Sequence, residues 1–357
     1  MIVVVAIVGL AVLSFLTGCA SLGGDVEGAR LARVEASAHY RDGAFFNDVP
    51  QSKASAGVYW DMAVEQFTGD QIRVPPFAIP VLPVVIENPN APPRDGLRAI
   101  WLGHSSVYLE LDGTRLLVDP VFSDRASPVG FLGPQRFHEP PISLTDLPKI
   151  DAVMISHDHY DHLDMPTIQH LSAKGSRFFV PLGIGAHLEA WGVPDAQIIE
   201  LEWWQSAKIN GVEIFATPSR HYSGRSIDDY KATLWSSWSM IGPRHRVYYS
   251  GDTGFSDHFK KIGDKFGPFD LSILKVGAYG PSSSWMDIHM DPEQAVQAHK
   301  AIQARRMLPV HWATFNMGFH DWDEPIKRTI RAANEANIDM ATPRLDCGNP
   351  AIEGAFV

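Results

Sequence analysis

A predicted strand that runs straight into a histidine-rich turn constrains this chain more than any other feature. Residues 151–155 are apolar and β-prone, which predicts a buried strand, and the polar run SHDHYDHLD follows it directly. Because the strand fixes the backbone, the turn can aim several side chains at one point. His157 and His159 can converge on one metal ion, while Asp161 and His162 serve a second ion nearby. Such paired ions clamp a hydrolytic transition state and generate hydroxide at neutral pH.

A single histidine in a turn is usually only a solvated or hydrogen-bonded side chain. So many ligand types in this order are hard to explain that way, and the pattern His-x-His-x-Asp-His resembles the signature of the metallo-β-lactamase superfamily. The resemblance implies an α/β fold, the four-layer αββα metallo-β-lactamase sandwich. It also implies three later ligands, each just after a predicted strand: His221, Asp252 and His311.

The implied centre holds two ions. Its first site contains His157, His159 and His221, its second contains Asp161, His162 and His311, and Asp252 bridges both. Imidazole and carboxylate ligands suit zinc and, less commonly, manganese or iron. We therefore expect two Zn²⁺ per chain, with Mn²⁺ or Fe as alternatives, and we expect Asp161 and Asp252 to act in catalysis as well as in binding.

The rest of the hydrophobic pattern agrees with this architecture. Strands in succession with helices between them predict two sheets covered by helices. The predicted strands are residues 98–102, 107–111, 115–118, 151–156, 177–180, 198–201, 212–216, 234–240, 247–250, 271–275 and 306–310. The predicted helices are residues 165–173, 184–191, 292–303 and 324–337.

The beginning of the chain predicts an exported, lipid-anchored protein. Residues 1–18 are almost wholly apolar and suit a signal peptide, although no Lys or Arg precedes the run. Leu16-Thr17-Gly18-Cys19 resembles the bacterial lipobox, which implies cleavage before Cys19 and lipidation of that cysteine. Ala20 in place of an aspartate implies the outer membrane of the cell envelope, facing the periplasm. A plain anchor helix is the alternative.

The apolar and charged composition limits the partners and the redox chemistry. With 45% hydrophobic residues the chain can build a sizeable core. A net charge of -11 disfavours a general nucleic-acid binder. If Cys19 is acylated, no intramolecular disulfide can form, because Cys347 is the other cysteine of the chain. We expect Cys347 to be a buried thiol.

Three parts follow one another along the chain. After the signal peptide, residues 19–95 are predicted to be a tether, from about 20 to 51, and a proline-rich arm, from 74 to 93. Proline density of this kind forbids a long helix or a central strand, so we expect an extended arm packed on the main domain. Residues 96–357 are predicted to form the catalytic domain.

Motifs beside the ligands narrow the resemblance. Between residues 98 and 315 the chain contains WLGH, VDPVFSDRASP, GPQRF, EWW, WSSWS, FGPFDL, GAY, HMDPE and HWATF. Together they look like the N-acyl-phosphatidylethanolamine-hydrolysing phospholipase D family. That resemblance implies a metal-dependent phosphodiesterase that takes N-acyl-phosphatidylethanolamine from the membrane and releases N-acylethanolamine and phosphatidic acid. The alternatives are a hydrolase of this fold that acts on a soluble phosphoester or lactone, and a non-catalytic envelope lipoprotein.

Several other polar residues carry weaker expectations. His289 is expected to hold a substrate phosphate or to assist the leaving group. His104 could support a ligand or be structural, Asp164 is expected to support a ligand, and Arg220 or Arg225 could hold the phosphate. The remaining histidines are expected at the surface or in packing: His39, His138, His170, His187, His245, His258, His299 and His320.

Overall fold

Two β-sheets packed face to face form the centre of the molecule. The computed structural model describes residues 18–52, 56–86, 95–280 and 282–342. In these residues one sheet has, in spatial order, β3 (Leu97–Gly103), β4 (Ser106–Leu111), β5 (Thr114–Val118), β6 (Ala152–Met154), β7 (Arg177–Pro181) and β8 (Ile198–Leu201). The other has β15 (Asp339–Met340), β14 (Ala304–Val310), β13 (Phe269–Lys275), β12 (Arg246–Tyr249), β11 (Ser237–Ile241), β10 (Val212–Thr217) and β9 (Ser206–Ile209).

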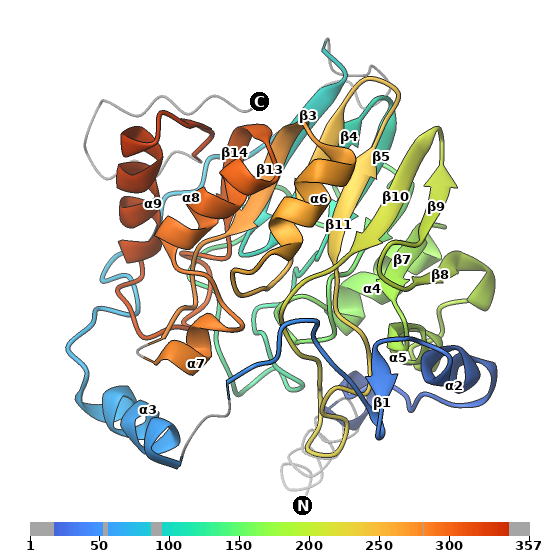
Figure 1. Ribbon diagram of the computed structural model, residues 1–357, viewed down its shortest axis with the longest axis horizontal. Coiled ribbons are helices and arrows are strands. Elements are labelled where there is room, and N and C mark those ends of the chain that lie inside the picture. Colours follow the sequence, from blue (N-terminus) through green and yellow to red (C-terminus); the bar gives the residue numbers. More distant parts are fainter. Residues whose placement is uncertain (1–17, 53–55, 87–94, 281, 343–357) are drawn as a thin grey trace, which may run out of the picture.

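Helices cover the outer face of each sheet (Figure 1). The first sheet carries α4 (Met165–Ala173) and α5 (Ile184–Ala190), and the second carries α6 (His258–Phe266), α8 (Pro292–Ala301) and α9 (Glu324–Glu335). Short segments complete the described structure: α2 (Gly28–Glu35), β1 (Tyr40–Arg41), β2 (Ala44–Phe45), α3 (Ala56–Thr68), a 3₁₀ turn (Asp195–Gln197) and α7 (Ser283–Met286). The predicted αββα order of layers is confirmed.

The alternation of side chains explains why the central strands are buried on both faces. In β4, Val107 and Leu109 point into the core between the sheets, whereas Tyr108 packs under the helices. In β12, Val247 lies between the sheets and Tyr248 faces α6 and α8. Strands apolar at every position are typical of sheets covered on both sides.

Parallel pairing brings the carboxyl ends of several strands to one edge. β5, β6, β7 and β8 run parallel, as do β12, β13 and β14. Helices provide the crossovers, with α4 between β6 and β7 and α6 between β12 and β13. Loops that leave the ends of these strands therefore meet at one place, which is where such folds build their sites.

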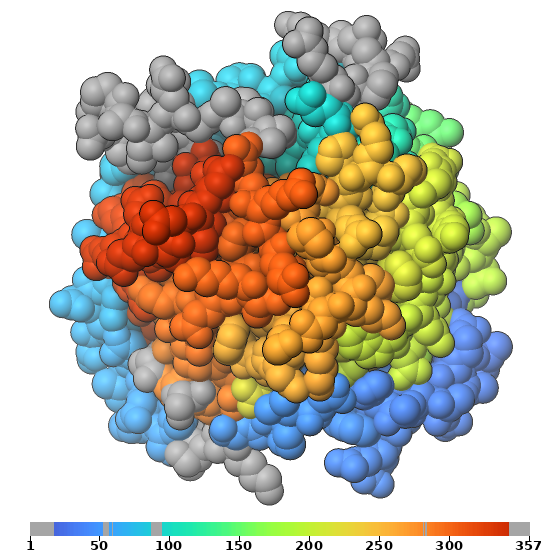
Figure 2. Space-filling view, turned by 45° about the horizontal axis from the view of Figure 1, so that its top comes forward, coloured from blue at the N-terminus to red at the C-terminus, as the bar shows by residue number. Residues whose placement is uncertain are grey.

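The segment predicted as a tether is folded. Between residues 20 and 51, α2 buries Val34, and β2 buries Phe45 beside Trp203 and Trp235. Arg30 adds an ion cluster to this contact, with Glu189, Asp195 and Glu200. Figure 2 shows the blue N-terminal residues pressed along the lower edge of the body. Apolar side chains spaced too widely to reveal a period, and ion pairs with residues far along the chain, are contacts that local sequence pattern does not display.

The proline-rich arm agrees with its prediction over the described residues. Residues 74–86 form neither helix nor strand, and Ile79 is buried against the helical layer of the second sheet. Residues 87–93 of the arm, the apolar run 1–17 and Cys347 lie outside the described residues. A search of the described residues for a helix long and apolar enough to cross a membrane found none.

Smaller differences concern element limits. The strand expected at 234–240 begins only at Ser237, and β9 and α6 were not predicted. Residues 234–236 instead run as a buried loop, in which the main-chain N–H groups of Leu234 and Ser236 bond to the carbonyls of Leu182 and Ser156. An apolar sequence marked this segment as buried, but burial alone does not distinguish a strand from a packed loop.

Candidate metal centre

The seven predicted ligands converge at one edge of the two sheets. The turn after β6 supplies His157, His159, Asp161 and His162. The other three residues follow three other strands, with His221 after β10, Asp252 after β12 and His311 after β14. Apart from the partly exposed His159, all are buried.

The first ligand group contains three imidazoles. His157 Nε2 lies 2.9 Å from His159 Nδ1, and His221 Nε2 lies 3.4 Å from the same His159 nitrogen. One nitrogen from each of the three residues therefore falls within 4.8 Å of the others. Three nitrogens so arranged can share one ion.

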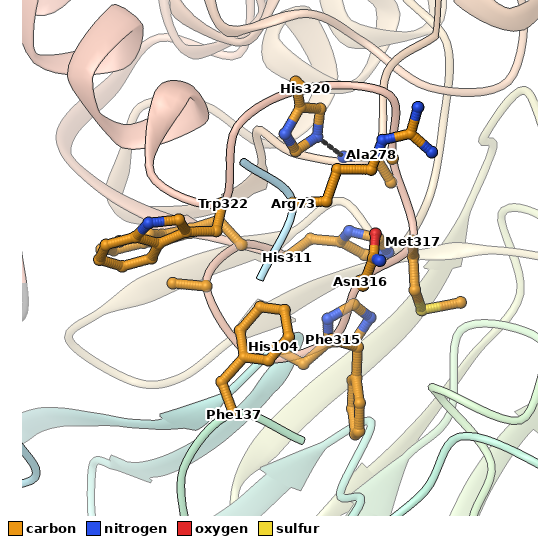
Figure 3. Close-up of a pocket in the computed structure, with 13 residues that line it drawn as sticks. Arg73, His104, Phe137, Ala278, His311, Phe315, Asn316, Met317, His320 and Trp322 are labelled. Carbon is orange, nitrogen blue, oxygen red and sulfur yellow. Dashed lines mark hydrogen bonds between the residues drawn. The ribbon is translucent and has the colours of Figure 1, made fainter. Parts of the chain in front are cut away.

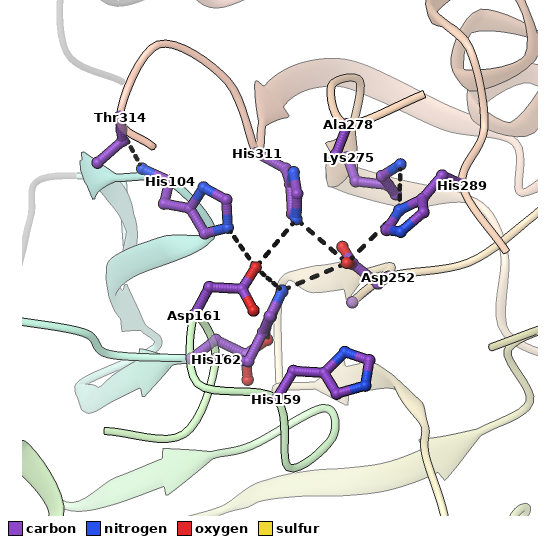
Figure 4. A network of polar contacts seen from close by, with 12 residues as sticks. His104, His159, Asp161, His162, Asp252, Lys275, Ala278, His289, His311 and Thr314 are labelled. Atoms are coloured by element: carbon purple, nitrogen blue, oxygen red, sulfur yellow. Dashed lines mark hydrogen bonds and ion pairs between the residues drawn. The ribbon is translucent and has the colours of Figure 1, made fainter. Parts of the chain in front are cut away.

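The second group mixes imidazole and carboxylate. Asp161 Oδ2 lies 3.2 Å from His162 Nε2 and 3.4 Å from His311 Nε2. Asp252 Oδ2 lies between the two groups, 3.4 Å from His162 Nε2, 3.1 Å from His311 Nε2 and 4.0 Å from His221 Nε2. Figure 4 shows Asp252 beside His162 and His311, and its role as a bridging ligand stays a prediction.

Three polar atoms of this cluster lack a partner in hydrogen-bond geometry within the described structure, although the two nitrogens among them lie within ion-pair distance of a carboxylate. They are His162 Nε2, His311 Nε2 and Asp252 Oδ1. Leaving a buried polar atom unpaired costs about 1–3 kcal/mol. Orphan atoms gathered from different loops at one point are therefore a specific fit for bound metal, which would satisfy them together.

The protonation states of the predicted ligands depend on burial and on their charged neighbours. Burial, followed by the charge of neighbouring imidazoles, holds the pKa of His157 well below its usual value, so it is neutral and has a free lone pair. Burial alone would raise the pKa of Asp252, but His311 and His162 outweigh it and hold that pKa well below the usual range. His157 and Asp252 are thus in the forms that bind metal. Burial would lower the pKa of His162 and of His311, but the Asp161 and Asp252 carboxylates outweigh it and raise both, so these two imidazoles must lose a proton when metal binds.

Asp119 orients a ligand and was not singled out by sequence. It follows β5, and its Oδ2 accepts a hydrogen bond from His162 Nδ1 at 2.6 Å, which leaves His162 Nε2 to face the centre. Tyr249 Oη and Ser156 Oγ donate to the same carboxylate. The available signal was its position, because Asp119 is a polar residue directly after an apolar strand, as the ligands are.

His104 and His289 both reach the cluster. His104 Nε2 lies 2.8 Å from Asp161 Oδ2, so this histidine supports a predicted ligand. Burial, then the charge of His311, lowers the pKa of His104 to about 3. His289 Nδ1 lies 3.6 Å from Asp252 Oδ2 and 2.9 Å from the fully buried ammonium of Lys275. A catalytic role for His289 stays a prediction.

Asp164 and the two candidate phosphate-binding arginines are engaged elsewhere. Asp164 accepts hydrogen bonds from Ser123 and Thr167 and thereby holds a loop rather than a ligand. Arg225 is buried, and its guanidinium donates to main-chain carbonyls on both sides. Arg220 pairs with Asp287 at 2.8 Å. Asp164 thus supports a loop where it was expected to support a ligand, and phosphate binding by Arg220 or Arg225 stays a prediction.

Three of the bystander histidines contact groups other than the predicted ligands. His170 is a partly exposed residue of α4 beside Leu144 and Lys174, His299 packs on Ser272, and His187 lies near Asp158. His320 instead lines the pocket beside His104 and His311, so the division between ligand and bystander histidines stays a prediction.

A narrow pocket opens beside the second ligand group (Figure 3). Its wall includes His104 and His311 of the cluster, the apolar side chains of Phe137 and Trp322, and Arg73 from the N-terminal arm. The Arg73 guanidinium donates to three uncharged oxygens, from Glu65, Gln66 and Gln71. The pocket therefore combines apolar walls with a positive charge next to the ligands.

Comparison with known proteins agrees with this site. The family profile described as Beta-lactamase superfamily domain matches residues 114–312. A protein of Mycobacterium tuberculosis, named only as uncharacterised, is 43% identical over 336 residues, which cover 91% of this chain and 87% of the relative. The N-acyl-phosphatidylethanolamine-hydrolyzing phospholipase D 1 of Caenorhabditis elegans is 41% identical over 257 residues, 69% of this chain and 72% of the relative.

One solved structure supports the fold independently. The structure of Igni18, described as a novel metallo hydrolase from the archaeon Ignicoccus hospitalis, superposes with a TM-score of 0.53 at 23% sequence identity. The match covers 70% of this chain and 95% of that chain. With the strand-end ligands, their orphan atoms and the family match all in agreement, the chain is a metal-dependent hydrolase that belongs to the metallo-β-lactamase superfamily.

Proposed function

We propose that the protein is a dinuclear zinc phosphodiesterase that hydrolyses N-acyl-phosphatidylethanolamine in the phospholipase D manner. The products would be N-acylethanolamine and phosphatidic acid. The observation that carries the proposal is the pair of ligand groups with the Asp252 carboxylate between them. Two ions held there would supply a water-derived nucleophile at neutral pH and offset charge on the phosphoryl oxygens.

Residues of the chain itself would position the nucleophile and protonate the departing oxygen. The Asp161 and Asp252 carboxylates would supply fixed negative charge around the nucleophile. His104 and His311 contact these carboxylates and hold them in place. Lys275 Nζ donates a hydrogen bond to His289 Nδ1. His289 therefore carries its own proton at Nε2 and can donate from there to the departing oxygen. Burial lowers the pKa of Lys275 to about 7, and burial together with Lys275 holds the pKa of His289 well below its usual value, so the imidazole stays neutral beside the lysine.

The phospholipid substrate rests on two further supports. The similar protein from Caenorhabditis elegans carries that activity in its name. The Arg73 guanidinium, which donates to uncharged oxygens, provides a cation beside His311 for a phosphodiester.

The proposed setting is the bacterial envelope. Cys19 is exposed, as a lipidated residue must be, and we propose that it anchors the protein to the outer membrane on the periplasmic side. The partners are then the membrane and its phospholipids, with no role for nucleic acid.

Mass spectrometry of lipid products tests the activity. Zinc-loaded protein is incubated with N-acyl-phosphatidylethanolamine vesicles and, side by side, with soluble phosphodiesters and lactones. We expect N-acylethanolamine and phosphatidic acid in the first reaction only. Turnover confined to soluble substrates would support the soluble-substrate alternative. Protein that binds no metal and hydrolyses nothing would support the non-catalytic one.

A further inference from the structure

A segment far earlier in the chain grips the main chain of one ligand. Residues 45–52 lie across the loop that carries His221. The Asn47 side chain donates from Nδ2 to the His221 carbonyl at 2.9 Å and accepts at Oδ1 from the His221 N–H at 3.1 Å. Gln51 Nε2 donates to the same carbonyl at 3.0 Å.

Asn47 is itself held in one orientation. It is 7% exposed, and Trp235 Nε1 donates to its Oδ1 at 2.9 Å. With two donors on Oδ1 and one acceptor at Nδ2, the amide fits in one direction only. The Trp235 indole also reaches the carbonyl of Ser219 at 3.1 Å, so it keeps a partner if Asn47 is shortened.

The same segment joins two loops of the centre. Arg220, next to His221, donates to the carbonyls of Val49 and Pro50, at 3.2 and 2.6 Å. The N–H of Ser52 donates to Asp287 Oδ2 at 2.6 Å. Asp287 lies two residues before His289, and the carbonyl between them, of Ile288, lies 3.1 Å from His221 Nδ1.

The two metal sites depend unequally on this contact. His157 and His159 come from the short turn that also supplies the second site, and β6 holds that turn. His221 is the ligand of the first site that comes from a separate loop. If that loop moves, the three nitrogens of the first site no longer converge, whereas Asp161, His162 and His311 keep their places. Ligands bind tightly only when surrounding contacts fix them beforehand.

We propose that residues 45–52 are a clasp, and that Asn47 is a positioning residue that sets the affinity of the first metal site through the main chain of His221. The clasp makes the N-terminal segment part of the metal centre. The inference rests on the proposed two-metal centre, and the experiment below separates failure of the one from failure of the other.

The test compares Asn47→Ala with His39→Asn. His39 lies in the same N-terminal segment and pairs with Glu202 and Asp48, away from the metal ligands, so it controls for loosening of the segment. Zinc is titrated into metal-free full-length protein against a chromophoric chelator, and Co²⁺ absorption reports ligand geometry. We expect Asn47→Ala to weaken one of the two ions about 10- to 100-fold, the range for loss of a supporting contact, while the other ion and both ions of His39→Asn stay unchanged.

Two results would overturn the clasp. One is Asn47→Ala protein that binds both ions with unchanged affinity. The other is an equal loss at both sites that His39→Asn reproduces, which would indicate general loosening. If Asn47→Ala does not fold, Gln51→Met removes a single donor to His221 and should weaken the same ion by a smaller factor. Unchanged affinities in Gln51→Met would then overturn the clasp. An unaltered chain that binds no metal would instead overturn the proposed function.

Discussion

Asp252 shows how much one carboxylate does in this centre. Its Oδ2 lies within 4.0 Å of imidazole nitrogens from three different loops, those of His162, His311 and His221. Its charge is kept by His311 and His162, which outweigh the cost of burial and hold the pKa of the carboxyl low. The imidazoles around Asp252 therefore depend on the negative charge of this residue more than on its shape.

Replacing that charge should abolish hydrolysis. We expect Asp252→Asn to lower kcat by about 10²- to 10³-fold or more, the loss typical when a preorganised electrostatic contact is removed. The fold should survive, because asparagine has nearly the same size. KM should change less, since acyl-chain burial remote from the reacting bond also contributes to binding. Steady-state kinetics on the lipid substrate measure both.

His170→Asn is the matched control for that variant. His170 is a partly exposed residue of α4, away from the ligands. A folded His170→Asn protein as inactive as Asp252→Asn would show that ligand and bystander histidines have been divided wrongly. Near-normal activity of Asp252→Asn with two metals bound would refute the bridge.

Asp119 permits a second test at this scale. Its carboxylate fixes the ring of His162, so Asp119→Asn should weaken metal binding by about 10- to 100-fold. Asp164→Asn removes a carboxylate from the same region that holds Ser123 and Thr167 instead. Chelator competition should separate the two variants. Equal weakening in both would mean that the contact with His162 is not the cause.

At the scale of elements, strands were predictable and their context was not. The runs that became β4, β5, β7 and β14 were found within two residues of their limits, because most of their side chains are apolar and buried. The ligands at strand ends were found through the resemblance to the superfamily signature. Asp119 and Asn47 were missed because their roles depend on partners 43 and 174 residues away in sequence.

The packing of α8 on β13 gives the chain an acid-sensitive contact. His299 of α8 is 3% exposed, and its Nδ1 lies 2.9 Å from Ser272 Oγ of β13. Burial, followed by the charge of Lys300, lowers the pKa of His299 to about 4. In the unfolded chain this histidine takes up a proton near pH 6.5, whereas the native state resists protonation until about pH 4. The contribution of neutral His299 to the free energy of unfolding is therefore fully present above pH 6.5 and is lost as the pH falls toward 4.

Removing that histidine should make the chain less sensitive to acid. We expect His299→Asn to lower Tm somewhat at neutral pH but to reduce the slope of Tm against pH between 6.5 and 4. Scanning calorimetry of both proteins in the same buffers measures the slope, and the titrating metal ligands, common to both, cancel in the comparison. An unchanged slope would show that His299 is not held neutral.

At the scale of the whole molecule, the N-terminal residues belong to the catalytic body. The clasp reaches His221, and α2 packs on α5 and β8 through the ions around Arg30. The sequence indicated a tether here, and it did not reveal these contacts because several partners of the segment are polar groups far along the chain. Long-range ion pairs and amide contacts have no periodic signature.

Lipidation of Cys19 is the prediction at this scale. Protein taken from native membranes should have an intact mass that corresponds to an acylated chain beginning at Cys19. The Cys19→Ser chain, which cannot be acylated, should lose its membrane retention. An unmodified chain released in soluble form would refute the anchor.

The hydrogen bonds from Arg225 to a residue near Cys19 have a mechanical consequence. Its guanidinium bonds to the carbonyl of Ser21 at 2.8 Å and, on its other side, to that of Leu163 in the ligand turn. Trp191 Nε1 holds the carbonyl of Ala20 at 2.7 Å. A lipid attached at Cys19 would thus be joined to the folded body without a flexible linker. The protein would then be held at a fixed height and tilt above the leaflet, and its rate of encounter with lipid would depend on lipid density per area. A force on the anchor would reach the turn that carries His157 to His162 through the Arg225 side chain.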